Sequence, residues 1–172
     1  MLSKDEYKNM VNVFKSYYAT SCFLLSNIHP SMMNELLRNM GADRGSTVRW
    51  GRIDNSYYEM DLYQSLEQTI NNPQFNLAQL GLPLFPIITL LHDLAKENGF
   101  LNHSQEFEFF RHIRNAISHG NRFTFSRNEP SRPAAFKNKT IDHNLNGYEN
   151  VLFTFIGIGD TLDLLDHLRD NI

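Results

Sequence analysis

Apolar residues recur every three to four positions along most of this chain, which is the spacing of helices that bury one face. Ser3 and Glu6 have the spacing of a capping box, and Gly41 and Gly99 stand where a residue past a helix end is expected. The pattern predicts helices over residues 3–27, 31–40, 57–70, 83–98, 102–119 and 160–172. It also predicts one further helical turn over residues 77–82.

Between the last two predicted helices the pattern changes to a period of two. Phe123 and Phe125 alternate with polar residues, and residues 139–143 and 151–156 have the pattern of short strands. Asn146-Gly147, between the latter two, favours a tight hairpin turn. We therefore expect a small antiparallel β insert, at about residues 121–157, before the C-terminal helix.

The remaining stretches are polar and predict loops at residues 42–56 and 126–135. We expect Trp50 to pack the first of these loops against the core, with stacking on a nucleic-acid base as the alternative. No repeat or linker divides the chain. The predicted fold is thus a single domain, residues 1–172, that is mainly α, an up-and-down helical bundle with a small β insert.

The composition is that of an ordinary globular protein with an excess of Phe. The single cysteine, Cys22, excludes an intramolecular disulfide framework and is predicted to be a buried, small apolar residue. We find no signal-peptide pattern and no stretch with the length and apolar character of a membrane span. We therefore expect a cytoplasmic protein with no membrane partner.

The formal net charge of −3 gives no overall nucleic-acid signature, but the charges are unevenly placed. Residues 107–139 contain seven Lys and Arg against two Glu, and residues 38–52 contain four Arg against one Asp. Local basic patches on an acidic protein can hold a phosphate backbone. Solvated surface is the alternative interpretation of either cluster.

The helix predicted over residues 102–119 carries more candidate chemistry than any other stretch. At about 100° per residue, its core face is formed by Phe110, Ile113 and Ile117. The opposite, polar face is formed by Glu108, His112, Asn115 and His119. Arg111 and Ser118 fall at one flank, and Arg114 falls near the boundary of the apolar face.

Arg114, Asn115 and His119 are the candidate catalytic residues. The helix dipole favours a protonated His119 in the last turn, and histidine exchanges protons near neutral pH. The fork of donors on Arg114 matches a phosphate. One proton carrier and one phosphate clamp can cleave RNA without a metal ion, because RNA supplies its own 2′-hydroxyl nucleophile. The alternative is that both side chains only complement the helix dipole.

Other residues complete the predicted site. Arg111, Ser118 and Arg122 are candidates for contacts with RNA phosphates. His92 and Asp93 are predicted to lie off the buried face of their helix, at the surface. The sequence has no HExxH motif, no paired cysteines and no tight carboxylate cluster, so we predict neither a metal site nor a cofactor.

The segment Arg114-Asn115-Ala116-Ile117-Ser118-His119-Gly120 resembles the signature of the HEPN superfamily, the helical domains of many prokaryotic ribonucleases and toxins. That signature is an Arg, usually followed by a polar residue, and then a His after a few more positions. The predicted helix order is similar as well. The resemblance covers the helical frame, but neither the segment from Met40 to Ser56 nor the β insert.

The resemblance implies an HEPN-like bundle and a metal-independent endoribonuclease that acts as a toxin or an antiphage defence effector. It implies a homodimer in which two motif helices form one composite active site. His119 would transfer protons and Arg114 would stabilise the transition state. It also implies a nucleotidyltransferase-like antitoxin as a partner.

Two other functions compete with this one. A non-catalytic HEPN domain would bind RNA, a nucleotide or a partner protein through the same basic clusters. A helical interaction or structural protein is also compatible with the sequence, which has no phosphate-binding glycine loop and no metal-site motif. The first would leave bound RNA uncut, and the second would be compatible with a monomer.

Overall fold

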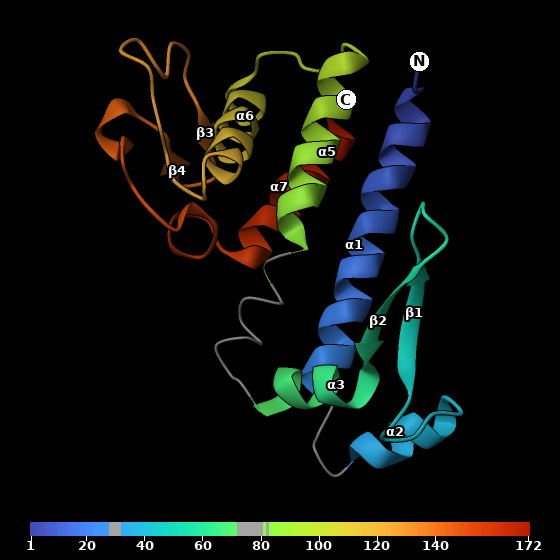
Figure 1. The fold of residues 1–172 in the computed structure, drawn as a ribbon. Coiled ribbons are helices and arrows are strands. Elements are labelled where there is room, and N and C mark those ends of the chain that lie inside the picture. The colour runs from blue at the N-terminus through green and yellow to red at the C-terminus, as the bar shows by residue number, and fades with distance from the viewer. Residues whose placement is uncertain (28–31, 72–80, 82) are drawn as a thin grey trace. The chain divides into compact units, whose positions relative to one another are not determined.

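The computed structural model describes residues 1–27, 32–71, 81 and 83–172 (Figure 1). In these residues the chain is mostly helical, with two small antiparallel sheets, which confirms the predicted mainly α class. Apart from Gly81, the turn predicted over residues 77–82 lies outside the described part of the chain. The chain forms two compact units, Met1–Tyr18 with Gly81–Ile172 and Ala19–Leu80.

Four long helices follow the predicted pattern closely. They are α1 (Lys4–Asn27), α5 (Leu84–Glu97), α6 (Gln105–Ser118) and α7 (Ile158–Asp170). The predicted capping box starts α1, because the Ser3 N–H donates to the Glu6 carboxylate at 2.8 Å and the Glu6 N–H donates to the Ser3 hydroxyl at 3.2 Å. None of the described helices combines the length and the apolar character needed to cross a membrane.

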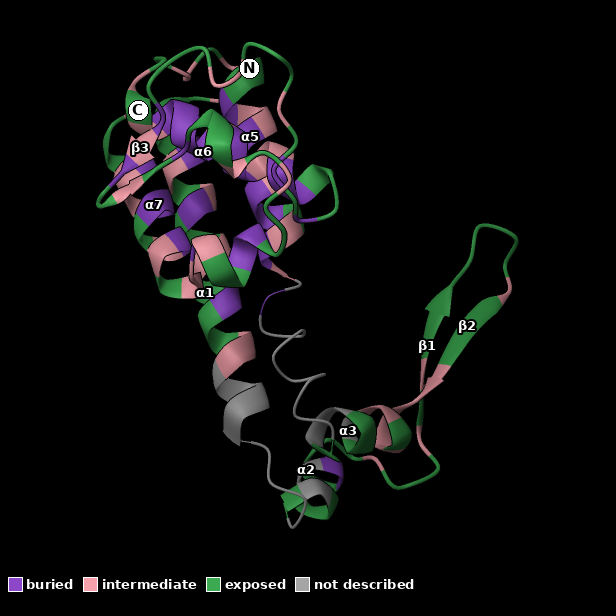
Figure 2. Ribbon diagram, turned by 90° about the vertical axis from the view of Figure 1, so that its left-hand side faces the viewer, coloured by how far each residue is buried: buried purple, intermediate pink, exposed green. Residues whose placement is uncertain are grey.

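Helix α6 lies at the centre of the first unit. It packs against α5, α7 and the segments at residues 135–136 and 151–155. Phe110 and Ile113 are fully buried and Ile117 nearly so, as predicted, and Phe109 is fully buried as well. Figure 2 shows the buried positions gathered on α5, α6 and α7. Because α6 is covered on most of its sides, few of its side chains reach solvent.

The β insert is smaller than predicted. It consists of β3 (Ala135–Phe136) and β4 (Lys139–Thr140), which pair antiparallel before α7. The predicted strand around Phe123 and Phe125 is reduced to a single bridge between Arg122 and Glu149. Backbone hydrogen bonds outside the strands also join segments of the insert, for example from the Phe123 N–H to the Tyr148 carbonyl at 2.9 Å.

The strand predicted over residues 151–156 is wrong. Residues Val151–Phe155 form an irregular π-type turn, η3, in which Phe153 has a φ of 106°. The buried Asn121 replaces a strand partner: its amide donates to the Leu152 carbonyl at 3.2 Å, and its side-chain oxygen accepts from the Leu152 N–H at 2.8 Å. Gly147 does lie in a turn, but that turn pairs with the Phe123 backbone and not with a strand at 151–156.

The start of α7 differs slightly from the prediction. Gly157 is the N-cap, so the helix begins before residue 160, and the Asp160 carboxylate accepts the Gly157 N–H at 3.2 Å in the first turn. Leu164, Leu165 and Leu168 are buried, whereas Leu162 is half-buried.

The second unit contains a β-hairpin that the sequence pattern missed. Its elements are α2 (Met33–Asn39), β1 (Thr47–Gly51), β2 (Tyr57–Asp61), the antiparallel partner of β1, and α3 (Leu62–Asn71). The loop predicted over residues 42–56 and the helix start predicted at Tyr57 are therefore wrong. The helix begins later because the Asp61 carboxylate accepts the Gln64 N–H at 2.7 Å, which is a capping contact.

Two side-chain predictions in this unit also fail. Trp50 does not pack against a core: it is 47% exposed, and its ring lies 5.9 Å from the ring of Tyr58 on the neighbouring strand. Cys22, predicted to be buried, is half-buried.

Candidate functional site

The ends of α6 are fixed by local contacts. The helix begins at Gln105 and not at the predicted residue 102, because Ser104 is the N-cap, and its hydroxyl accepts the Phe107 N–H at 3.4 Å. The helix ends at Ser118, His119 is the C-cap, and Gly120 follows with a φ of 76°. The candidate residues 111–119 therefore occupy the last turns of one helix.

A cavity of about 460 Å³ opens beside α6. It is lined by His92, Asp93, Lys96, Gly99, Leu101, His103, Arg111, Arg114 and Asn115. Five of these side chains are Lys, Arg or His, and Asp93 is the sole carboxylate among them. A small anion is therefore the kind of ligand that this cavity suits.

Arg114 is held by a neighbour on α5. Its Nη2 lies 2.9 Å from the Asp93 carboxylate, and its Nη1 donates to the Asn115 side-chain oxygen at 3.4 Å. The Arg114 Nε is buried and has no hydrogen-bond partner among the described residues. The guanidinium therefore has one unsatisfied N–H donor, but this atom is enclosed by the protein and not open to the cavity.

Asp93 also contacts His92, whose Nδ1 lies 3.2 Å from the carboxylate. Burial raises the pKa of Asp93, but the hydrogen bonds from Arg114 and His92 outweigh it, so the pKa is lower than usual. Burial lowers the pKa of His92, and the Asp93 hydrogen bond only partly opposes this change. Asp93 is therefore ionised and His92 neutral near pH 7, so Asp93 is the charged partner of Arg114.

The prediction that His92 lies at the surface is wrong. His92 is 5% exposed, and its ring centroid lies 5.6 Å from that of Phe110. Its Nε2 is buried and has no hydrogen-bond partner among the described residues. The sequence does contain a signal for this, because His92 follows the buried Ile88 by four positions and so shares its side of the helix.

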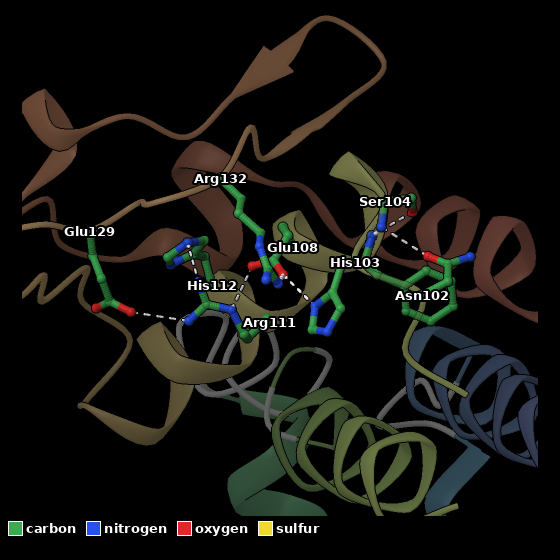
Figure 3. A network of polar contacts seen from close by, with 9 residues as sticks. Asn102, His103, Ser104, Glu108, Arg111, His112, Glu129 and Arg132 are labelled. Atoms are coloured by element: carbon green, nitrogen blue, oxygen red, sulfur yellow. Dashed lines mark hydrogen bonds and ion pairs between the residues drawn. The ribbon is translucent and has the colours of Figure 1, made fainter. Parts of the chain in front are cut away.

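Glu108 is the centre of a second polar network, drawn in Figure 3. Its carboxylate, 5% exposed, accepts from His103 at 3.0 Å, from Arg111 at 2.8 Å and from Arg132 at 3.4 Å. Burial raises the pKa of Glu108, but the hydrogen bonds from Arg111 and His103 outweigh it and lower the pKa. Glu108 thus stays ionised and joins α6 to the loop that carries Arg132.

His112 belongs to the same network and contradicts its predicted position on a polar face. It is 1% exposed, and its Nε2 accepts from Arg111 at 2.9 Å. Burial and the charge of Arg111 lower the pKa of His112 to about 4, so it is neutral at physiological pH. Arg111 also donates to Glu129 at 3.1 Å, so the insert covers the face of α6 that was expected to meet solvent.

The structure divides the six candidate residues into two groups. Arg111, Arg114 and Asn115 line the cavity. Ser118, His119 and Arg122 are exposed at the C-terminal end of α6 and are not among its lining residues. Arg122 Nη1 lies 3.5 Å from the carboxylate of the exposed Glu149. An exposed ion pair of this kind is weak, so a phosphate can replace the carboxylate at little cost in free energy.

No group of three or more His, Cys, Asp or Glu side chains in the described ranges is arranged to hold a metal ion. Comparisons of the chain with protein-family models, curated proteins and solved structures gave no match. The relation to HEPN proteins and the activity that it implies are therefore proposals. They rest on the residues of α6 and on the side chains around them.

Proposed function

We propose that this protein is a metal-independent endoribonuclease of HEPN type, a toxin or antiphage defence effector that cleaves RNA through its 2′-hydroxyl. One observation carries this proposal. Arg114 and Asn115 line a cavity that holds five Lys, Arg and His side chains and one carboxylate, and His119 is exposed at the end of the same helix. A phosphate site and a proton carrier thus lie on one short segment.

The reaction follows from these side chains. The 2′-oxygen attacks the phosphorus, the bond to the 5′-oxygen breaks, and the products carry a 2′,3′-cyclic phosphate and a 5′-hydroxyl. His119 moves a proton, taking it from the 2′-hydroxyl or giving it to the leaving 5′-oxygen. Arg114 stabilises the charge that builds on the phosphate oxygens, and the Asn115 amide donates a further hydrogen bond.

A homodimer with a composite site is part of the proposal. Arg114 and His119 are five positions apart, so they diverge by about 140° around the helix axis. His119 is also not a lining residue of the cavity that Arg114 faces. One chain alone therefore surrounds a phosphate poorly, whereas two motif helices facing each other bring an Arg and a His to each side.

The RNA strand would extend beyond the scissile phosphate onto Ser118 and Arg122, which are exposed at the end of α6. Arg111 is bound to Glu108 and Glu129, so a direct contact with RNA would require it to exchange one of these carboxylates for a phosphate. We further propose a nucleotidyltransferase-like antitoxin as the cellular partner, on the resemblance alone.

The direct test is cleavage of RNA by purified protein in EDTA. The wild type should cleave, and Arg114→Ala and His119→Ala should each reduce the rate by about a hundredfold or more. Arg127→Ala and His143→Ala are matched controls, because both residues are exposed and lie outside the site. Equal cleavage by all five proteins would indicate a contaminating nuclease and overturn the proposal.

A second function is favoured by one contact. Arg114 Nη2 donates to the Asp93 carboxylate at 2.9 Å, so the guanidinium is already paired and less available to a transition state. This pairing suits a domain that binds RNA, a nucleotide or a partner protein without catalysing a reaction. In that case the wild type would bind RNA at low salt and leave it intact, and Arg114→Ala would weaken binding.

A further inference from the structure

The two faces of the β1–β2 hairpin in the second unit carry side chains of different chemical character. The register pairs Val48 with Met60 and Trp50 with Tyr58, and these four side chains share one face because residues alternate along a strand. We call this the aromatic face. Thr47, Arg49 and Gly51 pair with Asp61, Glu59 and Tyr57, and they form the opposite face.

The aromatic face is open to solvent. Trp50 is 47% exposed and Tyr58 is 52% exposed, with their ring centroids 5.9 Å apart. Figure 2 shows that most of the hairpin is exposed. Two large rings held side by side on a pleated strand pair are ordered before a ligand arrives, so a flat ligand can stack on them at a small entropic cost.

Charge separates the two faces further. Both strand carboxylates, Glu59 and Asp61, belong to the opposite face, where Glu59 pairs with Arg49 at 2.7 Å. Arg52 continues the alternation of the aromatic face, and its guanidinium carbon lies 5.9 Å from the centroid of the Tyr58 ring. The aromatic face thus combines two stacking rings with a cation and places no strand carboxylate beside them.

Other arginines of this unit are exposed as well, although Arg49 belongs to the opposite face. The four exposed arginines of the unit are Arg38, Arg44, Arg49 and Arg52. Arg44 lies over the Tyr63 ring at 4.6 Å, which is a second pairing of guanidinium and aromatic ring. Six Asp and Glu residues balance these arginines within the unit, and two of them accept hydrogen bonds in local turns, Asp43 from Ser46 and Asp54 from Ser56.

We propose that the aromatic face binds unpaired bases of single-stranded RNA, with Trp50 and Tyr58 stacking on bases and Arg52 contacting the backbone. Stacking on aromatic rings does not depend on base identity, so this surface gives affinity more than sequence preference. That the strand is RNA rests on the proposed function, whereas the preference for unpaired bases rests on the hairpin itself. The alternative occupant, an apolar segment of a protein, would not require a cation beside the rings.

Trp50 is the only tryptophan of the chain, so its fluorescence reports on this face directly. The full chain is titrated with a 12-nucleotide 2′-O-methyl oligouridylate, which has unpaired bases but no 2′-hydroxyl to react. Saturable quenching of Trp50 is expected. Duplex RNA and inorganic polyphosphate should leave the fluorescence unchanged, and equal quenching by polyphosphate would overturn the proposal.

Variants separate stacking from hairpin stability. Tyr58→Ala should weaken binding by about 5- to 150-fold, the range for loss of one stacked base. Tyr57→Ala removes a similarly exposed ring from the opposite face and should change binding by less than about twofold. With a labelled oligonucleotide, Trp50→Ala should lose affinity and Trp50→Phe should restore most of it. Equal effects of Tyr57→Ala and Tyr58→Ala, or no quenching by any oligonucleotide, would refute the inference.

The same experiments distinguish this inference from the proposed nuclease activity. Arg114→Ala should still show quenching, because the hairpin is intact, while its cleavage of unmodified RNA is lost. RNA cleavage without quenching would refute the hairpin site and leave the nuclease proposal standing. Quenching of Trp50 without RNA cleavage would refute the nuclease proposal and leave the hairpin site standing.

Discussion

Asp93 orients Arg114, because its carboxylate forms the ion pair with the guanidinium. Asp93→Asn removes the sole carboxylate among the described lining residues of the cavity and loosens the orientation of Arg114. We expect RNA to bind about two- to fivefold more tightly at low salt, since the cavity becomes more positive. The cleavage rate at saturating RNA should fall about tenfold, because Arg114 is no longer positioned.

Binding by fluorescence anisotropy and single-turnover cleavage measure these two effects separately. Asp163→Asn is a control for loss of a carboxylate, since Asp163 is exposed and lies on α7. A variant that binds and cleaves less well in the same proportion would contradict a positioning role for Asp93.

His112 makes stability depend on pH. The folded protein protonates this imidazole only near pH 4, whereas an unfolded chain does so near 6.5. Between these values the unfolded state binds more protons, so the free energy of unfolding falls as the pH falls from about 6.5 towards 4. Relative to neutral pH, His112 lowers the free energy of unfolding at pH 5 by about 2 kcal/mol.

Urea unfolding at pH 7 and pH 5 checks this expectation. In His112→Gln the difference between the two pH values should shrink by about 2 kcal/mol, since the amide can accept from Arg111 but does not titrate. His143→Gln, at an exposed position, is the control for replacing an imidazole with an amide. An unchanged pH dependence in His112→Gln would show that other groups govern it.

At the scale of elements, the end of α6 depends on Gly120. A Cβ at Gly120 or at Gly159 would meet no atom within 4 Å, but only Gly120 has a positive φ, of 76°. Gly120→Ala should therefore lower the free energy of unfolding by about 1 kcal/mol, through backbone strain alone. Gly159→Ala, inside α7, should raise it by about 0.5 kcal/mol. Denaturant unfolding of the two variants tests this, and a loss of stability in both would contradict it.

The sequence predicts well those helices that bury a single apolar face against the rest of the protein. Tyr7 and Val11 on α1 and Ile88 and Leu91 on α5 are buried as their spacing requires. The pattern fails where tertiary contacts decide. Residues Tyr57–Asp61 have helical spacing but pair with β1, and the side chain of Asn121 holds Val151–Phe155 out of a strand.

The site was predictable in part for the same reason. Arg114 and Asn115 follow from the motif and do share a cavity. Glu108 and His112 were expected in solvent because a helical wheel contains no information on the insert that covers them. The Asp93–Arg114 pair joins residues 21 positions apart on two helices, and no local pattern reports such a contact.

At the scale of the whole molecule, the proposed composite site would need two chains. Analytical ultracentrifugation at micromolar concentration should show a dimer. Cleavage per chain should fall on dilution at the concentration where the dimer dissociates, because the monomer lacks half of the site. A monomer that cleaves at full rate would contradict the composite site and favour a site within one chain.

The chemistry of the product ends tests the proposed mechanism most directly. Wild-type protein is incubated in EDTA with a short RNA, and mass spectrometry identifies both ends of each fragment. Attack by the 2′-hydroxyl predicts a 2′,3′-cyclic phosphate and a 5′-hydroxyl, and no cut where a single 2′-deoxy residue precedes the scissile phosphate. Fragments with a 5′-phosphate and a 3′-hydroxyl, or cleavage at the deoxy position, would contradict it.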